Sequence, residues 1–185
     1  NTAAKHDHVI FEMSSGARIT YNDPRRFGFM ELLGKDEAIE RLMHLGPEPL
    51  GNSFNAPALI SALDGKTAKI KHALLDQRVV AGLGNIYVCE ALFRSRLSPL
   101  IISKHVTQAQ AETLTGHIKT VLTDAIAAGG STLKDFASAD GDLGYFQHSF
   151  DVYGREGAPC TVCKTPIARI TQGGRSTFYC EVCQP

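Results

Sequence analysis

Four of the five cysteines form two pairs near the C-terminal end of the sequence, and their spacing is typical of a metal site. Cys160 and Cys163 make one C-x-x-C pair and Cys180 and Cys183 the other, separated by the sixteen residues 164–179. A β-hairpin of this length would return the second pair to the first. Four thiolates complete the tetrahedral shell of Zn²⁺ and leave no open position, so the pattern predicts one structural zinc ion.

Two disulfides or a redox pair are the alternatives for these cysteines. No signal peptide is recognisable in residues 1–8, and this absence, with the paired spacing, favours zinc. Residues 147–185 hold few large apolar side chains, so we expect zinc binding to supply on the order of 10 kcal/mol to their folding. Cys89 has no C-x-x-C partner, and we interpret it as a small core residue.

Three separate residues could contact a phosphate. Arg175 follows Gly173-Gly174 at the expected hairpin tip, where a solvated turn arginine is the alternative interpretation. Asn85 is predicted to be the N-cap of a helix, whose free N–H groups attract anions. Lys71 lies on the preceding helix, close enough in sequence for the two helices to share one phosphate, although most Gly-Asn helix starts are only caps.

The segment Asp23-Pro24-Arg25-Arg26-Phe27-Gly28 is a further candidate for nucleic-acid contact. A proline-stiffened turn with two guanidinium groups and an aromatic ring can bind the backbone and wedge between bases. The alternative is a surface turn whose Phe27 side chain is tucked into the core.

The elements that would position these residues follow from periodicity, caps and breakers. A capping box, Thr107 to Gln110, opens the longest helix, which Gly129-Gly130 should end. Residues 140–144 are polar, rich in glycine and without periodicity, as in a loop. The other predicted strands are 9–13, 18–21, 28–33, 150–153 and 176–179, and the other predicted helices are 36–45, 56–63, 67–75 and 86–95.

Composition limits the class of protein. Of 185 residues, 43% are hydrophobic and 21% charged, which excludes low-complexity disorder, and no apolar run is long enough to span a membrane. Nineteen Lys and Arg balance nineteen Asp and Glu, but residues 64–104 hold seven basic and three acidic side chains. A local basic patch is therefore compatible with the neutral total.

Taken together, these segments resemble the formamidopyrimidine-DNA glycosylases, bacterial enzymes that repair 8-oxoguanine, in order and over essentially the whole chain. The resemblance is carried by Lys5-His6-Asp7-His8-Val9, by 22–28, by Ile70-Lys71 to Leu75-Asp76, by 80–87, by Gln147 and Val152-Tyr153-Gly154-Arg155, and by the four-cysteine hairpin with Gly173-Gly174-Arg175.

The resemblance implies a fold that is mainly α with a β zinc finger. Residues 1–34 would be remnant strands of an N-terminal β-sandwich lobe, 35–146 a helix-two-turn-helix domain with a base-recognition loop, and 147–185 a zinc finger. Lys71, Asn85 and Arg175 would grip phosphates beside the lesion, with His8 and Tyr153 as weaker candidates.

The resemblance also assigns base extrusion. Arg25 would enter the space left by the flipped nucleotide, Phe27 would wedge the stack, and Arg26 would contact DNA. The residues of the base-recognition loop would be Gly141, Asp142, Leu143, Gly144 and Tyr145.

The family's chemistry starts at an N-terminal proline and glutamate that this sequence lacks, so we expect a piece of a longer bacterial, cytoplasmic, nucleoid-associated protein, monomeric when complete. The complete protein would be a glycosylase and lyase acting on oxidised purines in double-stranded DNA, whereas these residues would bind oxidised or abasic DNA and contain no catalytic residue. Alternatives are an endonuclease VIII-type glycosylase for oxidised pyrimidines, or a non-enzymatic zinc-ribbon adaptor.

Overall fold

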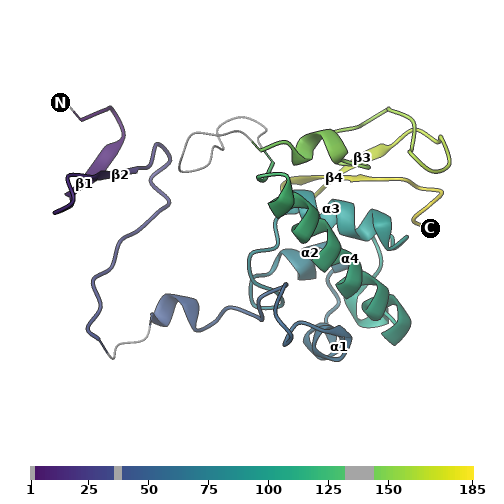
Figure 1. Ribbon diagram of the computed structural model, residues 1–185. Helices are drawn as coiled ribbons and strands as arrows, with labels where there is room; N and C mark the ends of the chain where they lie inside the picture. Colours follow the sequence, from purple (N-terminus) through teal and green to yellow (C-terminus); the bar gives the residue numbers. More distant parts are fainter. Residues whose placement is uncertain (1–2, 36–38, 132–143) are drawn as a thin grey trace. The chain divides into compact units, whose positions relative to one another are not determined.

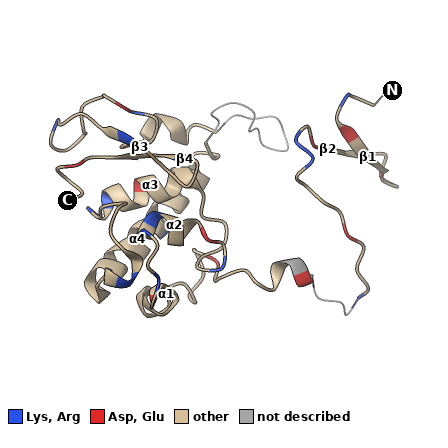
Figure 2. Cartoon of the chain, turned by 180° about the vertical axis from the view of Figure 1, so that it is seen from behind, with Lys and Arg blue, Asp and Glu red and all other residues tan. Residues whose placement is uncertain are grey.

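The computed structural model describes residues 3–35, 39–131 and 144–185. The chain divides into two compact units, residues 1–43 and 44–185 (Figure 1). Charged residues of both signs are scattered along both units (Figure 2), in keeping with equal numbers of basic and acidic side chains.

The first unit contains one antiparallel hairpin, β1 (Asp7–Glu12) paired with β2 (Arg18–Asn22). Gly16, at a φ of +83°, supplies the left-handed residue of the turn. The predicted third strand at 28–33 is wrong, since this described segment forms no strand. A strand needs a neighbour for its backbone hydrogen bonds, and β1–β2 is the only sheet in the described part of this unit.

The predicted helix 36–45 is also wrong over its described residues, where only the 3₁₀ turn η1 (Glu40–Leu42) forms. Short helices gain most of their stability from packing an apolar face, and here Leu42 remains half exposed. The hairpin likewise leaves apolar side chains uncovered: Phe11 lies opposite Ile19, and they are 45% and 55% exposed.

The described part of the second unit contains four α-helices, and the predicted helices of this region are all present. The predicted start of the second helix was three residues early. The helices are α1 (Ala56–Leu63), α2 (Ile70–Leu75), α3 (Asn85–Arg94) and α4 (Gln108–Ala127), with the 3₁₀ turns η2 (Ser103–His105) and η3 (Phe146–Ser149).

Local capping chemistry explains where two helices begin. Asn55 caps α1 by accepting the backbone N–H of Ala58 at 3.0 Å. The capping box of Thr107 and Gln110 at the start of α4 is confirmed. Helix α4 gives way to Gly129, at a φ of +72°, as predicted.

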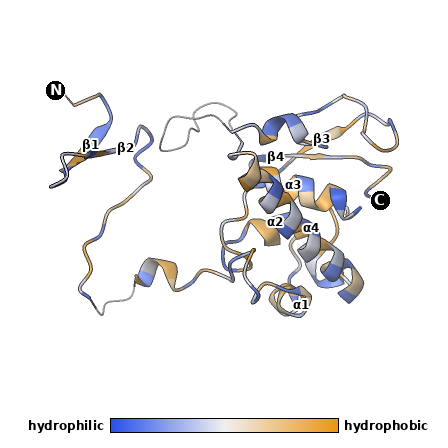
Figure 3. Cartoon of the chain, in the orientation of Figure 1, coloured by the Kyte–Doolittle hydropathy of each residue, from blue (hydrophilic) through white to orange (hydrophobic). Residues whose placement is uncertain are grey.

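The core of this unit lies between the four helices, whose apolar stretches are orange in Figure 3. Each large side chain buried there stabilises the fold by roughly 1.5–3 kcal/mol relative to exposure. Buried core residues from the four helices are Leu59, Leu63, Ile70, Leu74, Val88, Leu92, Leu114, Ile118 and Val121.

The hairpin β3 (Ala168–Gln172) and β4 (Arg175–Tyr179) packs beside α3. A second apolar cluster joins them, in which Cys89 and Phe93 of α3 meet Phe178 and Cys180. Cys89 is 1% exposed, which confirms its interpretation as a core residue. The expected fold, mainly α with a β zinc finger, is confirmed.

Candidate nucleic-acid interface and metal centre

The four paired cysteines converge on one point. Their Sγ atoms all lie within 4.8 Å of one another, with Cys160 to Cys183 at 3.9 Å and Cys163 to Cys180 at 3.4 Å. Four sulfurs at about 2.3 Å from a tetrahedral Zn²⁺ stand about 3.8 Å apart. The donor set and its spacing fit one structural zinc ion, with no position left open for chemistry.

Local hydrogen bonds prepare one of these thiols for metal binding. Side-chain and backbone hydrogen bonds from Thr165 lower the pKa of Cys163 to about 6. Because zinc binds the thiolate, this thiol needs little work to deprotonate at neutral pH.

The tip of the zinc hairpin is a two-residue turn of glycines. Gly173 and Gly174 both have positive φ, +55° and +73°, as a type I′ turn requires. A Cβ at Gly173 would lie 2.7 Å from His72 Nε2, so a larger residue would displace the His72 imidazole as well as strain the positive φ of this position. Arg175 follows the turn with an exposed side chain, and no described residue forms an ion pair with it.

The side chain of Lys71 on α2 contacts strand β4 of the same hairpin. Its Nζ donates to the backbone oxygen of Ser176 at 3.0 Å and to Thr177 Oγ1 at 2.6 Å. The side chain is fully buried, and burial lowers its pKa, with a further lowering by the charge of Arg175. No carboxylate of the described residues forms an ion pair with it. A buried ammonium that meets only neutral acceptors is costly unless an anion completes its surroundings.

Asn85 converges on the same atom. Helix α3 starts at Asn85 itself, and Gly84 is its N-cap, so the predicted capping role of Asn85 is wrong. Its Nδ2 instead donates to the backbone oxygen of Ser176 at 3.0 Å and to the hydroxyl of Tyr153 at 3.4 Å. Its Oδ1 is buried and accepts no hydrogen bond from the residues that the structure describes. The side chain is therefore committed to the zinc hairpin and retains one unused acceptor.

Glu90 is a site residue that the sequence pattern did not reveal. Its buried carboxylate on α3 accepts the backbone N–H groups of Asp151 at 2.8 Å, Val152 at 3.0 Å and Tyr153 at 2.8 Å. The predicted strand at 150–153 is wrong because these N–H groups bond to Glu90 instead of a neighbouring strand. A lone acid in the apolar run of residues 88–93 was the one available signal.

Tyr153 is held on two sides. Its backbone bonds to Glu90, and its ring packs edge-on against Phe178 of β4, with ring centroids 5.0 Å apart. Its hydroxyl then accepts from Asn85. The second unit thus brings Lys71, Asn85, Tyr153 and Arg175 together around the start of β4.

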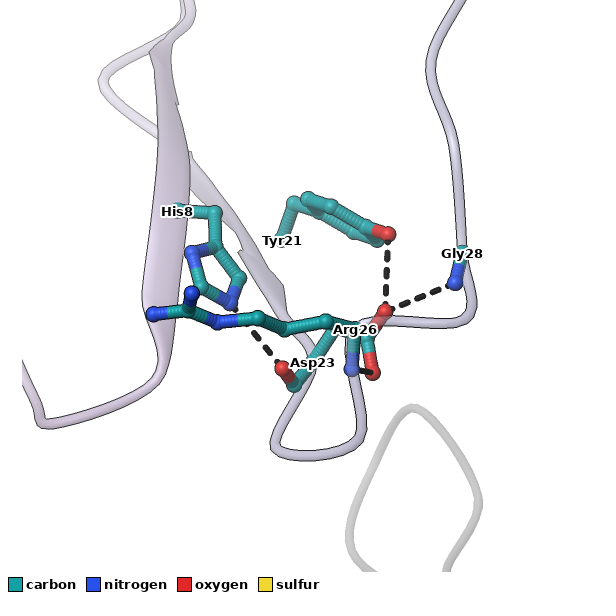
Figure 4. Close-up of a pocket in the computed structure, with 5 residues that line it drawn as sticks. All are labelled: His8, Tyr21, Asp23, Arg26 and Gly28. Carbon is teal, nitrogen blue, oxygen red and sulfur yellow. Dashed lines mark hydrogen bonds between the residues drawn. The ribbon is translucent and has the colours of Figure 1, made fainter.

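In the first unit, Asp23 organises the turn that carries the other candidates (Figure 4). Its carboxylate accepts the N–H groups of Arg25 at 3.1 Å, Arg26 at 2.9 Å and Gly28 at 2.8 Å, and the hydroxyl of Tyr21 at 3.2 Å. The Gly28 N–H contributes most to lowering the pKa of Asp23. The turn is therefore built by one side chain of its own sequence.

That turn projects its side chains outward. Phe27 is 78% exposed, so the alternative of a Phe27 tucked into a core does not hold within this unit. The Arg25 guanidinium lies 4.7 Å from the centre of its ring. Arg26 adopts a φ of +54°, and His8 Nε2 donates to the carbonyl oxygen of Asp23 at 2.9 Å.

The expected base-recognition loop is described only at its C-terminal end. Gly144 is buried, and a side chain there would collide with the carbonyl oxygen of Gly130, so the neck of the loop requires glycine. Tyr145 is 65% exposed, and its N–H donates to the carbonyl oxygen of Ala128. Gly141, Asp142 and Leu143 lie outside the described residues.

Two family models match this chain. The formamidopyrimidine-DNA glycosylase H2TH domain matches residues 45–137, and the zinc finger found in FPG and IleRS matches residues 157–185. Together they cover the helices and the hairpin that bring Lys71, Asn85 and Arg175 together.

Similar proteins agree with these models. The formamidopyrimidine-DNA glycosylase of Ruegeria pomeroyi is 59% identical over 98% of this chain and 66% of its own length. That of Rhodopseudomonas palustris strain TIE-1 is 56% identical over 97% of this chain and 64% of its own. The chain thus spans just under two thirds of these relatives.

Solved structures show the same similarity. The MutM (Fpg) protein of Thermus thermophilus is 40% identical, with a TM-score of 0.88 over 99% of this chain and 70% of its own. Lactococcus lactis Fpg in complex with DNA containing an abasic site is 35% identical, with a TM-score of 0.89 over 100% of this chain and 68% of its own. This chain belongs to the formamidopyrimidine-DNA glycosylase family.

Proposed function

We propose that these residues form the DNA-binding part of a bacterial glycosylase that removes oxidised purines from double-stranded DNA. The convergence of Lys71 and Asn85 on Ser176, directly after Arg175, carries this proposal. A phosphate at this point would meet the exposed guanidinium and the charge of the buried ammonium. Two cationic groups and an amide beside one backbone atom favour an anionic ligand.

The buried ammonium sharpens this proposal. Lys71 lies beneath Ser176, so it would act on a phosphate through the charge that it holds there, while Arg175 and Tyr153 make the outer contacts. Helix α3 starts beside this point, and its free N–H groups add partial positive charge. Binding by these elements reads the backbone and would be independent of base sequence.

The first unit would supply extrusion of the damaged base. Phe27 is exposed on a turn held by Asp23, and Arg25 packs on its ring. An apolar wedge with an adjacent cation can occupy the space that a flipped nucleotide leaves, offsetting an unstacking cost of a few kcal/mol. Arg26 and His8 would bind nearby backbone, and Gly144 and Tyr145 would anchor the loop over the base.

We propose that the complete protein is a formamidopyrimidine-DNA glycosylase and abasic-site lyase. The names of its relatives support the glycosylase activity. The chain spans just under two thirds of these relatives' lengths. We propose that these residues supply binding of damaged DNA and not the cleavage step.

We propose three parts of the chain: residues 1–34 with the wedge turn, 35–146 as the helix-two-turn-helix domain, and 147–185 as the zinc finger.

No helix of the described residues is long and apolar enough to cross a membrane. We place the complete protein with the DNA of the bacterial cytoplasm, acting as a monomer.

Binding to short fluorescent duplexes tests the proposal. Duplexes with an abasic-site analogue or with 8-oxoguanine opposite cytosine should bind at least several-fold more tightly than an undamaged duplex. Borohydride trapping should give no covalent adduct. A preference for oxidised pyrimidines would favour the endonuclease VIII type, binding to no duplex would contradict DNA binding altogether, and a trapped adduct would contradict the absence of catalysis.

A further inference from the structure

A chain of buried polar groups lies behind the ammonium of Lys71. Lys71 Nζ donates to Thr177 Oγ1 at 2.6 Å, and the Thr177 hydroxyl donates to Gln172 Oε1 at 2.8 Å. Gln172 Nε2 in turn donates to the backbone oxygen of Pro99 at 3.3 Å. Lys71 and Thr177 are fully buried and Gln172 is 8% exposed, so water does not compete for these bonds.

The direction of each hydrogen bond is determined at the Pro99 end of this series. The Pro99 oxygen can only accept, so it orients the Gln172 amide with its NH₂ group toward Pro99 and its oxygen toward Thr177. The single hydroxyl proton of Thr177 is then used on Gln172. Only the lone pairs of Thr177 remain for Lys71, and a lone pair is what an ammonium needs. The hydroxyl oxygen of Thr177 is therefore oriented so that it can only accept from Lys71.

The same two residues belong to the hairpin that carries Arg175. Gln172 pairs with Arg175 across the Gly173-Gly174 turn, and Thr177 follows two residues later on β4. Any shift of the hairpin tip would therefore move the acceptor of Lys71 together with Arg175. The position of the buried cation is thus coupled to the position of the exposed one.

We propose that Thr177 and Gln172 are positioning residues that hold the Lys71 ammonium beneath Ser176, where its charge acts on a bound phosphate. This inference rests on the proposed function. It goes beyond it by assigning a role in DNA binding to two buried side chains that would not touch DNA.

Three single variants test the first step, by anisotropy on a duplex with a central tetrahydrofuran abasic analogue. Thr177→Val keeps the shape of the side chain and removes the acceptor, and it should weaken binding about tenfold, in the range of one hydrogen bond to a charged group. Thr177→Ser restores the hydroxyl and should restore binding. Thr120→Val is the matched control, because that exposed hydroxyl bonds only to Gly116 of its own helix; it should bind as the unaltered chain.

A double-mutant cycle with Lys71→Met separates positioning from a general structural role. If Thr177 acts through Lys71, the double variant should bind no more weakly than Lys71→Met alone. Additive losses would overturn the proposal, as would unaltered binding by Thr177→Val. If a thermal melt shows that Thr177→Val is unfolded, Gln172→Met is tested instead, because it removes the acceptor of the Thr177 hydroxyl proton. Several-fold weaker binding by Gln172→Met supports the positioning role, and unaltered binding overturns it.

A further variant, Arg175→Ala, separates failure of the positioning role from failure of the proposed function. If Arg175→Ala weakens binding but Lys71→Met does not, the protein binds DNA and the positioning role is overturned. If the unaltered chain binds none of the duplexes, the proposed function itself fails, and the positioning role fails with it.

Discussion

Lys71 on α2 and Asn85 on α3 donate to the same acceptor, the backbone oxygen of Ser176, each at 3.0 Å. Ser176 follows Arg175, so two helices and a zinc-bound hairpin meet at one peptide unit. Neither helix could place its polar side chain there without the hairpin, and the hairpin would lose its two anchors without the helices. The proposed phosphate site is therefore a product of three elements.

Two arginines of the same hairpin should differ in their effect on DNA binding. Arg169 is ion-paired with Glu156 at 3.1 Å and its Nε also donates to Ser176 Oγ at 3.1 Å, whereas Arg175 has no ion-pair partner in the described chain. Arg175→Ala should weaken binding to an abasic duplex about tenfold and reduce the slope of log K against log salt by about 0.9. Arg169→Ala should reduce the salt slope less than Arg175→Ala does, because the charge of Arg169 is already paired with Glu156. Equal losses for both variants would mean that the hairpin contributes only general positive charge.

Removal of zinc should abolish DNA binding while leaving helices α1 to α4 folded. The zinc ligands flank β3 and β4, which carry Ser176 and Thr177, whereas the main core lies between the helices. Chelation or Cys180→Ser should therefore eliminate duplex binding but retain most of the helical circular dichroism. Cys89→Ala should keep one zinc per chain by metal analysis. Intact binding after verified zinc loss would show that the hairpin is stable without metal.

Glu90→Gln should destabilise the second unit by about 1–3 kcal/mol, because the carboxylate accepts three backbone N–H groups with its two oxygens and an amide would turn an NH₂ group toward one of them. Leaving a buried N–H without an acceptor has a cost of that order. Urea denaturation measures the loss, and the exposed Glu112→Gln on α4 serves as the control. A Glu90→Gln variant as stable as the unaltered chain would show that this carboxylate is dispensable.

The pH dependence of stability and of DNA binding should have opposite signs at Lys71. Burial lowers its pKa below the 10.5 of a free lysine. Between the native pKa and 10.5, the unfolded chain binds a proton that the native chain has lost, so the stability of the unaltered chain relative to Lys71→Met should rise with pH. DNA binding should fall over the same interval, because a neutral amine attracts no phosphate.

Unfolding and binding titrations at several pH values check both trends. Lys71→Met should show neither dependence on this group. A stability difference that is flat with pH would mean that Lys71 titrates as an exposed lysine does.

Chemistry encoded in neighbouring residues was predictable from the sequence. The paired cysteines, the Thr107–Gln110 capping box and the Gly173-Gly174 turn each depend on a few adjacent positions, and the zinc ion, the helix start and the hairpin follow from them. The resemblance to a known family added the expectation that Lys71, Asn85 and Arg175 act together.

Long-range contacts decided the rest. Asn85 was predicted as a helix cap, but packing against the hairpin places its amide where it donates to the backbone oxygen of Ser176, 91 residues away. Glu90 and residues 151–153 gave no joint signal, because a buried acid is tolerated only when distant N–H groups surround it. Local patterns specify caps, turns and ligand pairs, whereas the partner of a buried polar group depends on which segments the core brings together. Only the folded chain determined that the Lys71 ammonium lies against Ser176 without an ion-pair partner among the described residues.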